Sequence, residues 1–265
     1  MDNRPILFLD SGVGGIHYCR DFIGRNPRET VFYLADREHF PYGPRSKNEI
    51  TSLLTTLTEK LITTANPKIA VIACNTASIS ALAILRQNFP QLPFIGTVPA
   101  IKPAAEVSKN GIIGVLGTER TIDDIRSLNQ KDDSYEIFGI AAPELVEFVE
   151  QNFGKTNKEE KTVIAKKYIA PFLDKRVASL VLGCTHFLYL LEEFRREAAG
   201  KIKIFDSVEG ITKRIEYLLD ENDGELRAEQ AAPHRLLLTG DQPPSDIWQN
   251  RALMLGFNLC LLNEM

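Results

Sequence analysis

The sequence is poor in cysteine. It has four among 265 residues, and no two of them form a CxxC pair. Their spacing therefore indicates neither a zinc site nor a disulfide framework, and in a reducing compartment they should stay thiols. We accordingly predict no bound metal.

Long apolar runs and an excess of basic charge are also missing. No stretch approaches the roughly 18 to 20 apolar residues that span a bilayer, and residues 1–6 lead straight into a short strand-like run without the features of a signal peptide. The formal net charge is −4, and lysine and arginine are scattered along the chain. We expect a cytoplasmic protein whose partners include neither nucleic acid nor a membrane.

What is present is an ordinary globular composition, 44% hydrophobic and 25% charged. Apolar runs alternate with segments of helical period, which is typical of βα units around a mostly parallel sheet. Helices are expected over 46–64, where Ser46 and Glu49 form a capping box, and over 158–173. Strands are expected near 5–10, 30–35, 68–73, 93–95, 111–116, 135–140, 178–182, 202–205, 235–239 and 257–262.

Two of the cysteines occupy related positions. Cys74 follows an apolar run within the segment ACNTAS, and Cys184 follows another within GCTH. Each thiol ends a predicted strand beside hydroxyl or amide side chains, whereas Cys19 and Cys260 fit the commoner role of a small buried hydrophobe. The two motifs lie about 110 residues apart, which is close to the length of one domain.

The chain also resembles itself at long range. A strand followed by a small hydroxylic turn occurs at 8–12 and again at 115–118. We therefore predict an α/β fold of two pseudo-symmetric domains, each a mostly parallel sheet flanked by helices, with the active site in the cleft where the carboxyl ends of their strands face each other. The predicted domains are residues 1–98 with 207–265, and residues 99–206.

Two thiols on opposite sides of one carbon could invert it, because one removes a proton while the other supplies a proton to the opposite face. A hydrolase needs one nucleophile, an oriented base and an oxyanion hole, so the second thiol would be surplus. His186, next to Cys184, could exchange a proton with that thiol. Asp36 and Glu150 are further candidates for tuning the site, although either could be an ordinary surface carboxylate.

Two loops complete the candidate site. The loop 10–15 (DSGVGG) opens a helix, but its glycine spacing fits a dinucleotide fingerprint poorly and it lacks a Walker lysine. Its backbone amides and Ser11 could instead hold a carboxylate, with Asp10 beside a reactive group. The loop 40–44 (FPYGP) is either a rigid connection or a cover that closes over a small ligand.

These motifs, taken in order along the chain, resemble the glutamate racemase family, and the resemblance covers nearly the whole sequence. It implies a cofactor-independent enzyme that converts L-glutamate to D-glutamate for peptidoglycan. It also implies that Cys74 is the base towards D-glutamate and Cys184 the base towards the L form, with Asp10 and His186 assisting the respective thiols. The substrate-holding positions that it implies are Ser11, Pro41, Tyr42, Gly43, Asn75, Thr76, Thr118, Thr121 and Thr185.

One departure from the family pattern concerns the segment after the second cysteine motif. Residues Phe187, Leu188 and Tyr189 lack the proline common there, which alters packing without removing a proton carrier. Alternatives that stay open are an aspartate racemase or related α-proton isomerase, and a non-catalytic amino-acid-binding or regulatory protein. A homodimer is one arrangement that the sequence leaves open.

Overall fold

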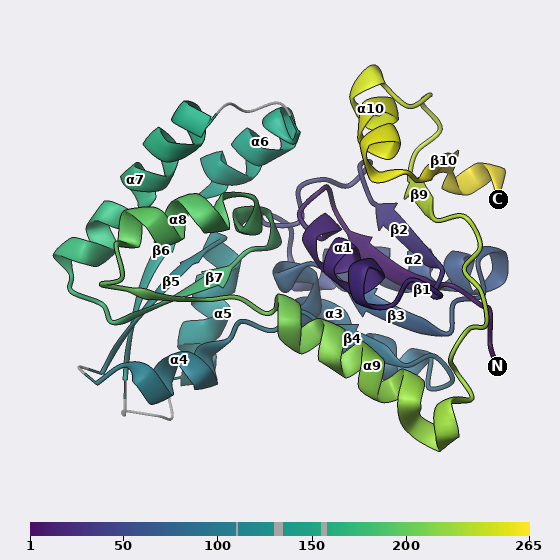
Figure 1. Ribbon diagram of the computed structural model, residues 1–265, viewed down its shortest axis with the longest axis horizontal. Helices are drawn as coiled ribbons and strands as arrows, with labels where there is room; N and C mark the ends of the chain where they lie inside the picture. Colours follow the sequence, from purple (N-terminus) through teal and green to yellow (C-terminus); the bar gives the residue numbers. More distant parts are fainter. Residues whose placement is uncertain (110, 130–134, 155–157) are drawn as a thin grey trace. The chain divides into compact units, whose positions relative to one another are not determined.

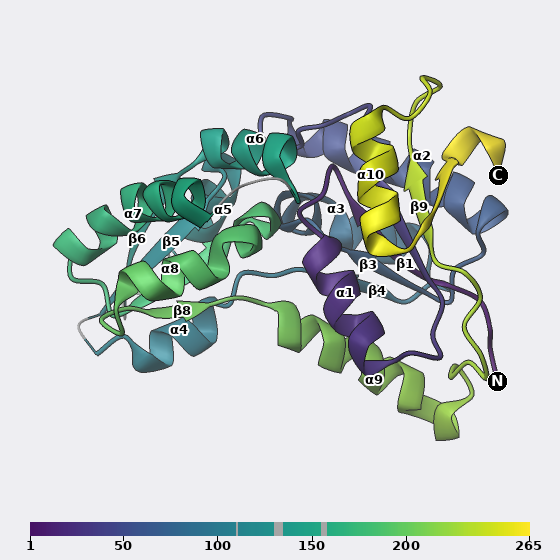
Figure 2. The same cartoon turned by 45° about the horizontal axis from the view of Figure 1, so that its top comes forward.

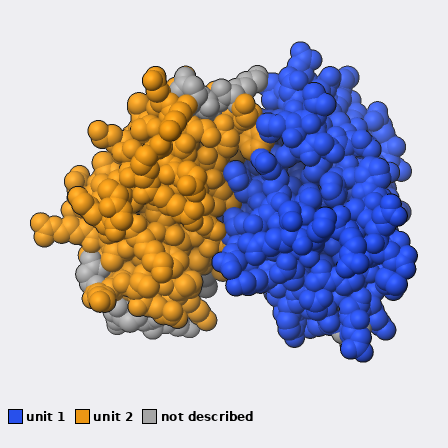
Figure 3. All heavy atoms as spheres, in the orientation of Figure 1, with its two compact units in different colours: residues 1–97, 208–265 blue, residues 98–207 orange. Residues whose placement is uncertain are grey.

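The computed structural model describes residues 1–109, 111–129, 135–154 and 158–265, and it confirms an α/β fold with two parallel sheets flanked by helices (Figure 1). The chain divides into two compact units, which Figure 3 colours separately. Unit 1 comprises Met1–Thr97 and Val208–Met265, and unit 2 comprises Val98–Ser207. Each predicted strand is present with its ends within one residue of the expected positions.

Unit 1 holds a six-stranded sheet in the order β10-β9-β2-β1-β3-β4, and every adjacent pair is parallel. Its elements are β1 (Ile6–Asp10), α1 (Ile16–Arg25), β2 (Val31–Ala35), α2 (Lys47–Thr64), β3 (Ile69–Ile72), α3 (Asn75–Asn88), β4 (Phe94–Gly96), α9 (Val208–Gly224), β9 (Arg235–Leu238), α10 (Asp246–Leu255), β10 (Asn258–Leu261) and η2 (Leu262–Glu264).

Alternation along the strands decides which helices cover which face of this sheet. Leu7 and Leu9 of β1 belong to the same buried cluster as the apolar residues of α2 and α3. Phe8 points the other way and contacts Phe22 of α1, with ring centroids 6.1 Å apart. Helix α2 begins with the predicted capping box, since Ser46 Oγ accepts from the Glu49 amide and the Glu49 carboxylate accepts from the Ser46 amide.

Unit 2 holds a four-stranded parallel sheet in the order β6-β5-β7-β8. Figure 2 labels its strands β5, β6 and β8. Its elements are α4 (Ile101–Val107), β5 (Ile112–Gly117), α5 (Glu119–Asn129), β6 (Glu136–Ala141), α6 (Pro143–Asn152), α7 (Lys158–Asp174), β7 (Ser179–Gly183), the 3₁₀-helix η1 (Thr185–Leu190), α8 (Leu191–Ala198) and β8 (Lys203–Phe205).

Both faces of this smaller sheet are covered as well. Ile113, Val115 and Val181 form a buried cluster with residues of α4 and α5. On the opposite face the ring of Phe172, from α7, meets that of Phe138 edge-on at 5.6 Å. The two central strands, β5 and β7, are almost wholly buried, and their mainly apolar sequences are typical of parallel strands covered on both faces, whereas the edge strands β6 and β8 are partly exposed.

The two sheets share one strand order. In chain order, the strands β2-β1-β3-β4 of unit 1 and β6-β5-β7-β8 of unit 2 both follow the sequence 2-1-3-4. In this order the strand connections reverse direction between the first and third strands, and ligands of open parallel sheets bind at that switch point, beyond the carboxyl ends. Both cysteine motifs follow the third strand of their sheet. Within the described residues, no helix is long and apolar enough to cross a membrane.

Candidate active site

The unit 1 residues predicted to form the site gather at the carboxyl edge of its sheet. The amide of Asp36, one residue beyond β2, donates to the carbonyl of Asp10 at 2.8 Å. The amide of Ala73, one residue beyond β3, donates to the carbonyl of Leu9 at 2.7 Å. Asp10, Asp36 and Cys74 therefore end three neighbouring strands, β1, β2 and β3.

The loop after β1 is folded around the carboxylate of Asp10. That carboxylate is fully buried and accepts from the Gly12 amide at 3.2 Å and from the Ser11 hydroxyl at 3.3 Å. Gly15 has no room for a side chain, because a Cβ there would lie 2.6 Å from the Cβ of Ala73. The glycine at this position thus allows the loop to approach the end of β3 next to Cys74.

Cys74 is extended and immediately precedes α3, which begins at Asn75. Its side chain is largely buried, and the residue is 8% exposed. Neither the Oδ1 nor the Nδ2 atom of Asn75 has a hydrogen-bond partner among the described residues, although both atoms are buried. A buried amide without partners is costly, and such groups usually mark a place where a ligand or water completes the bonding. Thr76, next along the helix, is also buried.

Asp36 is the centre of a buried hydrogen-bond network. Its carboxylate accepts from the Tyr42 hydroxyl at 2.6 Å and the Thr239 hydroxyl at 2.7 Å, and it lies 2.8 Å from Nδ1 of His39. Burial raises the pKa of Tyr42 well above its ordinary value, and the charge of Asp36, its hydrogen bond, and the charges of Cys74 and Asp10 raise that pKa further. Tyr42 is therefore a neutral phenol whose hydroxyl donates a hydrogen bond to the Asp36 carboxylate.

The loop that carries Tyr42 also contains Pro41, which is exposed, and Gly43, which is partly buried. It is tied down at both sides, because Arg45 Nε donates to the carbonyl of His39 at 2.7 Å and Arg37 Nε donates to the carbonyl of Thr239 at 2.7 Å. Such fixing favours the rigid connection between β2 and α2 over a freely moving cover.

In unit 2, three side chains form a chain of contacts. The sulfur of Cys184 lies 3.8 Å from Nδ1 of His186, and Nε2 of His186 lies 2.8 Å from a carboxylate oxygen of Glu150. Burial by itself would lower the pKa of His186, but the hydrogen bonds to Cys184 and Glu150, together with their charges, raise that pKa well above its ordinary value. The imidazole is thus placed to hold a proton between a thiol and a carboxylate. Cys184 is 7% exposed.

The three threonines of unit 2 that were predicted to hold substrate lie at or near helix starts. Thr118 directly precedes α5, and Thr121 lies in the first turn of that helix. The Thr118 hydroxyl accepts a hydrogen bond from the Thr121 amide at 3.2 Å and donates one to the Thr121 hydroxyl at 3.0 Å. This is the geometry of an N-cap, so the pair has a structural use whether or not it also holds a substrate. Thr185 is buried and begins η1.

The remaining cysteines differ from these two. Cys19 is fully buried, its thiol donates to the carbonyl of Ile16, and burial raises its pKa to about 12. The prediction that Cys260 is buried is wrong, since it is only partly covered. The reason is its place on β10, an edge strand of the six-stranded sheet, where the core covers only part of the side chain. Among the described residues, no group of three or more potential ligands could hold a metal ion.

Comparison with known proteins identifies the family. The family model "Asp/Glu/Hydantoin racemase" matches residues 18–215. A curated glutamate racemase of Roseiflexus sp. (strain RS-1) is 35% identical over 223 residues, which cover 82% of this chain and 80% of that protein. The chain belongs to the glutamate racemase family. It is accordingly assigned to the racemases, a class of isomerases.

Solved structures agree with this assignment. The glutamate racemase of Escherichia coli, in complex with L-glutamate and the activator UDP-MurNAc-ala, has a TM-score of 0.84 at 28% identity, with 97% of each chain covered. The enzyme of Francisella tularensis subsp. tularensis SCHU S4, in complex with D-glutamate, has a TM-score of 0.77 at 26% identity, with 100% of each chain covered.

Sequence reasoning did not identify His39 and Thr239 as members of the site. His39 stands three residues after Asp36, a spacing that alone says little. Thr239 follows β9, which lies beside β2 in the sheet although about 200 residues separate them. The strand that neighbours β2 is decided by topology, and no local pattern announces it.

Proposed function

We propose that this protein interconverts L- and D-glutamate by a two-base mechanism, with Cys74 and Cys184 on opposite faces of the substrate α-carbon. The observation that carries the proposal is the matched placement of the two thiols. Each follows the third strand of its sheet, each is mostly buried, and each lies close to other ionisable groups. Further support comes from the two relatives solved with L-glutamate and with D-glutamate.

In the direction from L-glutamate, the thiolate of Cys184 removes the α-proton, so that an S–H bond forms as the C–H bond breaks. The electron pair is delocalised into the α-carboxylate. The thiol of Cys74 then donates its proton to the other face, which leaves D-glutamate and a Cys74 thiolate. The reverse direction exchanges the two roles, and the pair of protonation states is restored by proton exchange before the next turnover.

The neighbours of the thiols have separate tasks in this proposal. His186, held by Glu150, exchanges a proton with Cys184, while Asp10 assists Cys74. The amide of Asn75, which has no partner in the described part of the chain, holds the charged groups of glutamate together with Ser11, Tyr42, Gly43, Thr76 and Thr185. Pro41, Thr118 and Thr121 shape the site around them. The product would supply D-glutamate for peptidoglycan in the cytoplasm.

The test uses purified protein with L-glutamate and no added cofactor in deuterated water. Loss of the circular dichroism signal, together with deuterium at Cα in the product, is the expected result. A non-catalytic amino-acid-binding protein would show neither change, and such an outcome would refute the proposal. L-aspartate is assayed in parallel, because a higher kcat/KM for aspartate would reassign the substrate while retaining the chemistry.

A further inference from the structure

The carboxyl end of α6 is capped by a tyrosine from another element. The last carbonyls of a helix have no donor within the helix. The hydroxyl of Tyr189 supplies one, donating to the carbonyl of Asn152 at 3.0 Å, and it accepts from the amide of Gly154 at 3.3 Å. Gly154 has a φ of 82°, a conformation that glycine adopts readily where a chain leaves a helix. Tyr189 therefore ties η1 to the end of α6.

The same two elements carry His186 and Glu150. A 3₁₀-helix has three residues per turn, so side chains three positions apart stack on one face. His186 and Tyr189 are three positions apart in η1, and both reach α6: His186 contacts Glu150 at 2.8 Å, and Tyr189 caps the carbonyl two residues later. The His186–Glu150 ion pair and the Tyr189–Asn152 hydrogen bond are thus neighbouring contacts that join η1 to the last turn of α6.

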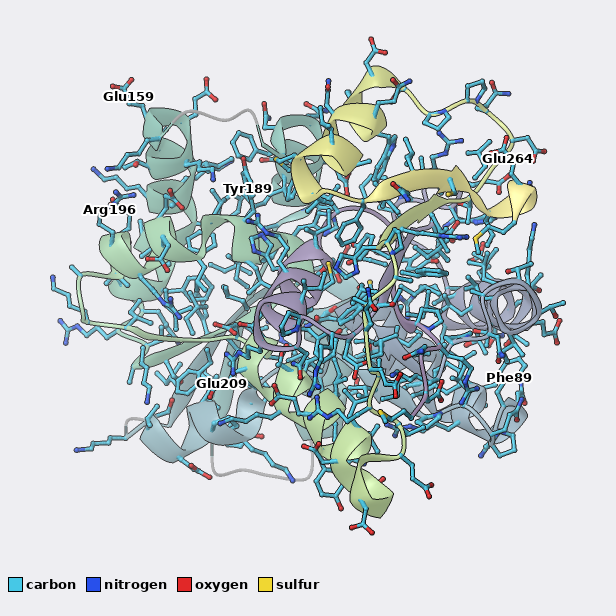
Figure 4. The ribbon with its side chains drawn as sticks, turned by 45° about the vertical axis from the view of Figure 1, so that its right-hand side comes forward. Phe89, Glu159, Tyr189, Arg196, Glu209 and Glu264 are labelled. Carbon is cyan, nitrogen blue, oxygen red and sulfur yellow. The ribbon has the colours of Figure 1, made fainter. Side chains whose placement is uncertain are left out.

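The ring of Tyr189, labelled in Figure 4, is itself held in place. Its centroid lies 5.6 Å from that of Phe153, the residue that follows α6. On α7, the Nζ atom of Lys161 lies 3.6 Å from the Tyr189 centroid and 3.4 Å from the Tyr189 carbonyl oxygen. A ring fixed by an aromatic and a cationic neighbour directs its hydroxyl to one place, because few rotamers remain open to it.

We propose that Tyr189 is a positioning residue for the Cys184–His186–Glu150 chain. It acts through Glu150, by holding the end of α6 at the separation from η1 that a short hydrogen bond to His186 requires. The inference rests on the proposed function for its consequence in catalysis. The proposal also assigns a role to Tyr189 within the segment 187–189, where the sequence departs from the family pattern.

The first experiment compares Tyr189→Phe with Tyr168→Phe. Tyr168 lies on α7 of the same unit, and its hydroxyl interacts with Glu144 in the first turn of α6, whereas Glu150 lies in the last turn. In Tyr189→Phe we expect kcat to fall about threefold to tenfold, which is the fold-change for one or two lost neutral hydrogen bonds, with KM changed less than twofold. Tyr168→Phe should leave both constants unchanged. An unaltered kcat in Tyr189→Phe would overturn the proposal.

The second readout separates positioning from general support of the fold. With α-deuterated substrates, the primary isotope effect should rise in Tyr189→Phe for L-glutamate, whose proton Cys184 removes. For D-glutamate, whose proton Cys74 removes, it should stay constant or fall, because Cys184 then acts only in the later reprotonation step. An equal change for both enantiomers would overturn the proposal. A double-mutant cycle with Glu150→Gln adds a further condition: in the Glu150→Gln background, Tyr189→Phe should cost little more, because its effect has already been lost. Additive losses would contradict action through Glu150.

Two measurements need no catalysis, and they distinguish failure of this inference from failure of the proposed function. Iodoacetamide labelling of Cys184 should change in Tyr189→Phe while that of Cys74 stays constant, even if the protein racemises no glutamate. In the wild-type protein, the amide hydrogen of Gly154 should exchange slowly with solvent, because this amide donates a hydrogen bond to the Tyr189 hydroxyl. Fast exchange of this amide would overturn the inference even if Tyr189→Phe failed to fold.

Discussion

In both units the thiol follows the third strand of a sheet with the same strand order, but the side chains around the two thiols differ. In unit 1, the charges of Cys74 and Asp10 both act on the phenol of Tyr42, and Cys74 is followed by an amide that has no hydrogen-bond partner among the described residues. In unit 2, Cys184 is hydrogen-bonded to an imidazole that is backed by a carboxylate. Topology therefore places each sulfur atom after the third strand of its sheet, and the side chains around the two sulfur atoms differ.

The supports behind each thiol differ in the same way. In unit 1, the Asp36 carboxylate accepts hydrogen bonds from Thr239, which follows β9, and from Tyr42 in the loop 37–45, and these bonds fix that loop at the end of the sheet. In unit 2 the contacts run along one short path from η1 to α6. A change in unit 1 should therefore spread over several contacts, while a change in unit 2 should act mainly through Glu150.

The largest expected effect tests whether both thiols are needed. Cys74→Ala and Cys184→Ala should each lower the racemisation rate at least about a thousandfold, because a positioned acid or base contributes factors of that order. Circular dichroism of L-glutamate measures the rate, and Cys260→Ala serves as the matched control with near-normal activity. If either site variant kept a tenth of the activity, the two units would not be partners in one reaction.

Thiol labelling compares the two site cysteines with a structural one. Because burial raises the pKa of Cys19 to about 12, its thiolate fraction at neutral pH is very small. Iodoacetamide should modify Cys74 and Cys184 at least about a hundredfold faster than Cys19, as mapped by mass spectrometry of the native protein. Equal labelling of the three would argue against reactive thiols in either unit.

Glu150→Gln sharpens the contrast by removing the charge behind the imidazole that contacts Cys184. We expect kcat to fall about tenfold and the pKa of His186 to decrease, because the neutral amide no longer favours the imidazolium. Titration of the His186 ring signals by nuclear magnetic resonance measures the second effect. An unchanged pKa would mean that Cys184 alone keeps the proton on the ring.

The same pair makes stability depend on pH. The pKa of His186 is raised in the folded state, so its contribution to the free energy of unfolding is fully present below about pH 6.5 and is lost as the pH rises through the raised value. The stability difference between wild type and Glu150→Gln should therefore be larger at pH 6 than at alkaline pH, as urea unfolding would measure. A difference that grew with pH would contradict this sign.

The smallest expected effect concerns Thr239 in unit 1. Thr239→Val removes one donor from the buried Asp36 carboxylate and should lower the free energy of unfolding by about 1.5 to 3 kcal/mol. Thr239→Ser keeps the hydroxyl and is the matched control. Labelling of Cys74 should change in the valine variant while that of Cys184 does not. A change at both thiols would show that the two units do not respond separately.

Much of this protein could be predicted from its sequence because the decisive signals are local. Apolar runs predicted the strands, Ser46 and Glu49 predicted the start of α2, and the motifs around Cys74 and Cys184 placed each thiol after a strand. Such features depend on backbone propensity, periodicity and capping, which act over a few neighbouring residues.

Only the tertiary structure decided which distant side chains meet. Thr239 reaches Asp36 because β9 pairs with β2, and Tyr189 reaches Asn152 because η1 lies against the end of α6. It also decided that Cys260 stays partly exposed, since β10 is an edge strand. These contacts follow from strand order and packing, which sum many weak interactions over the whole unit, so no single stretch of sequence determines them.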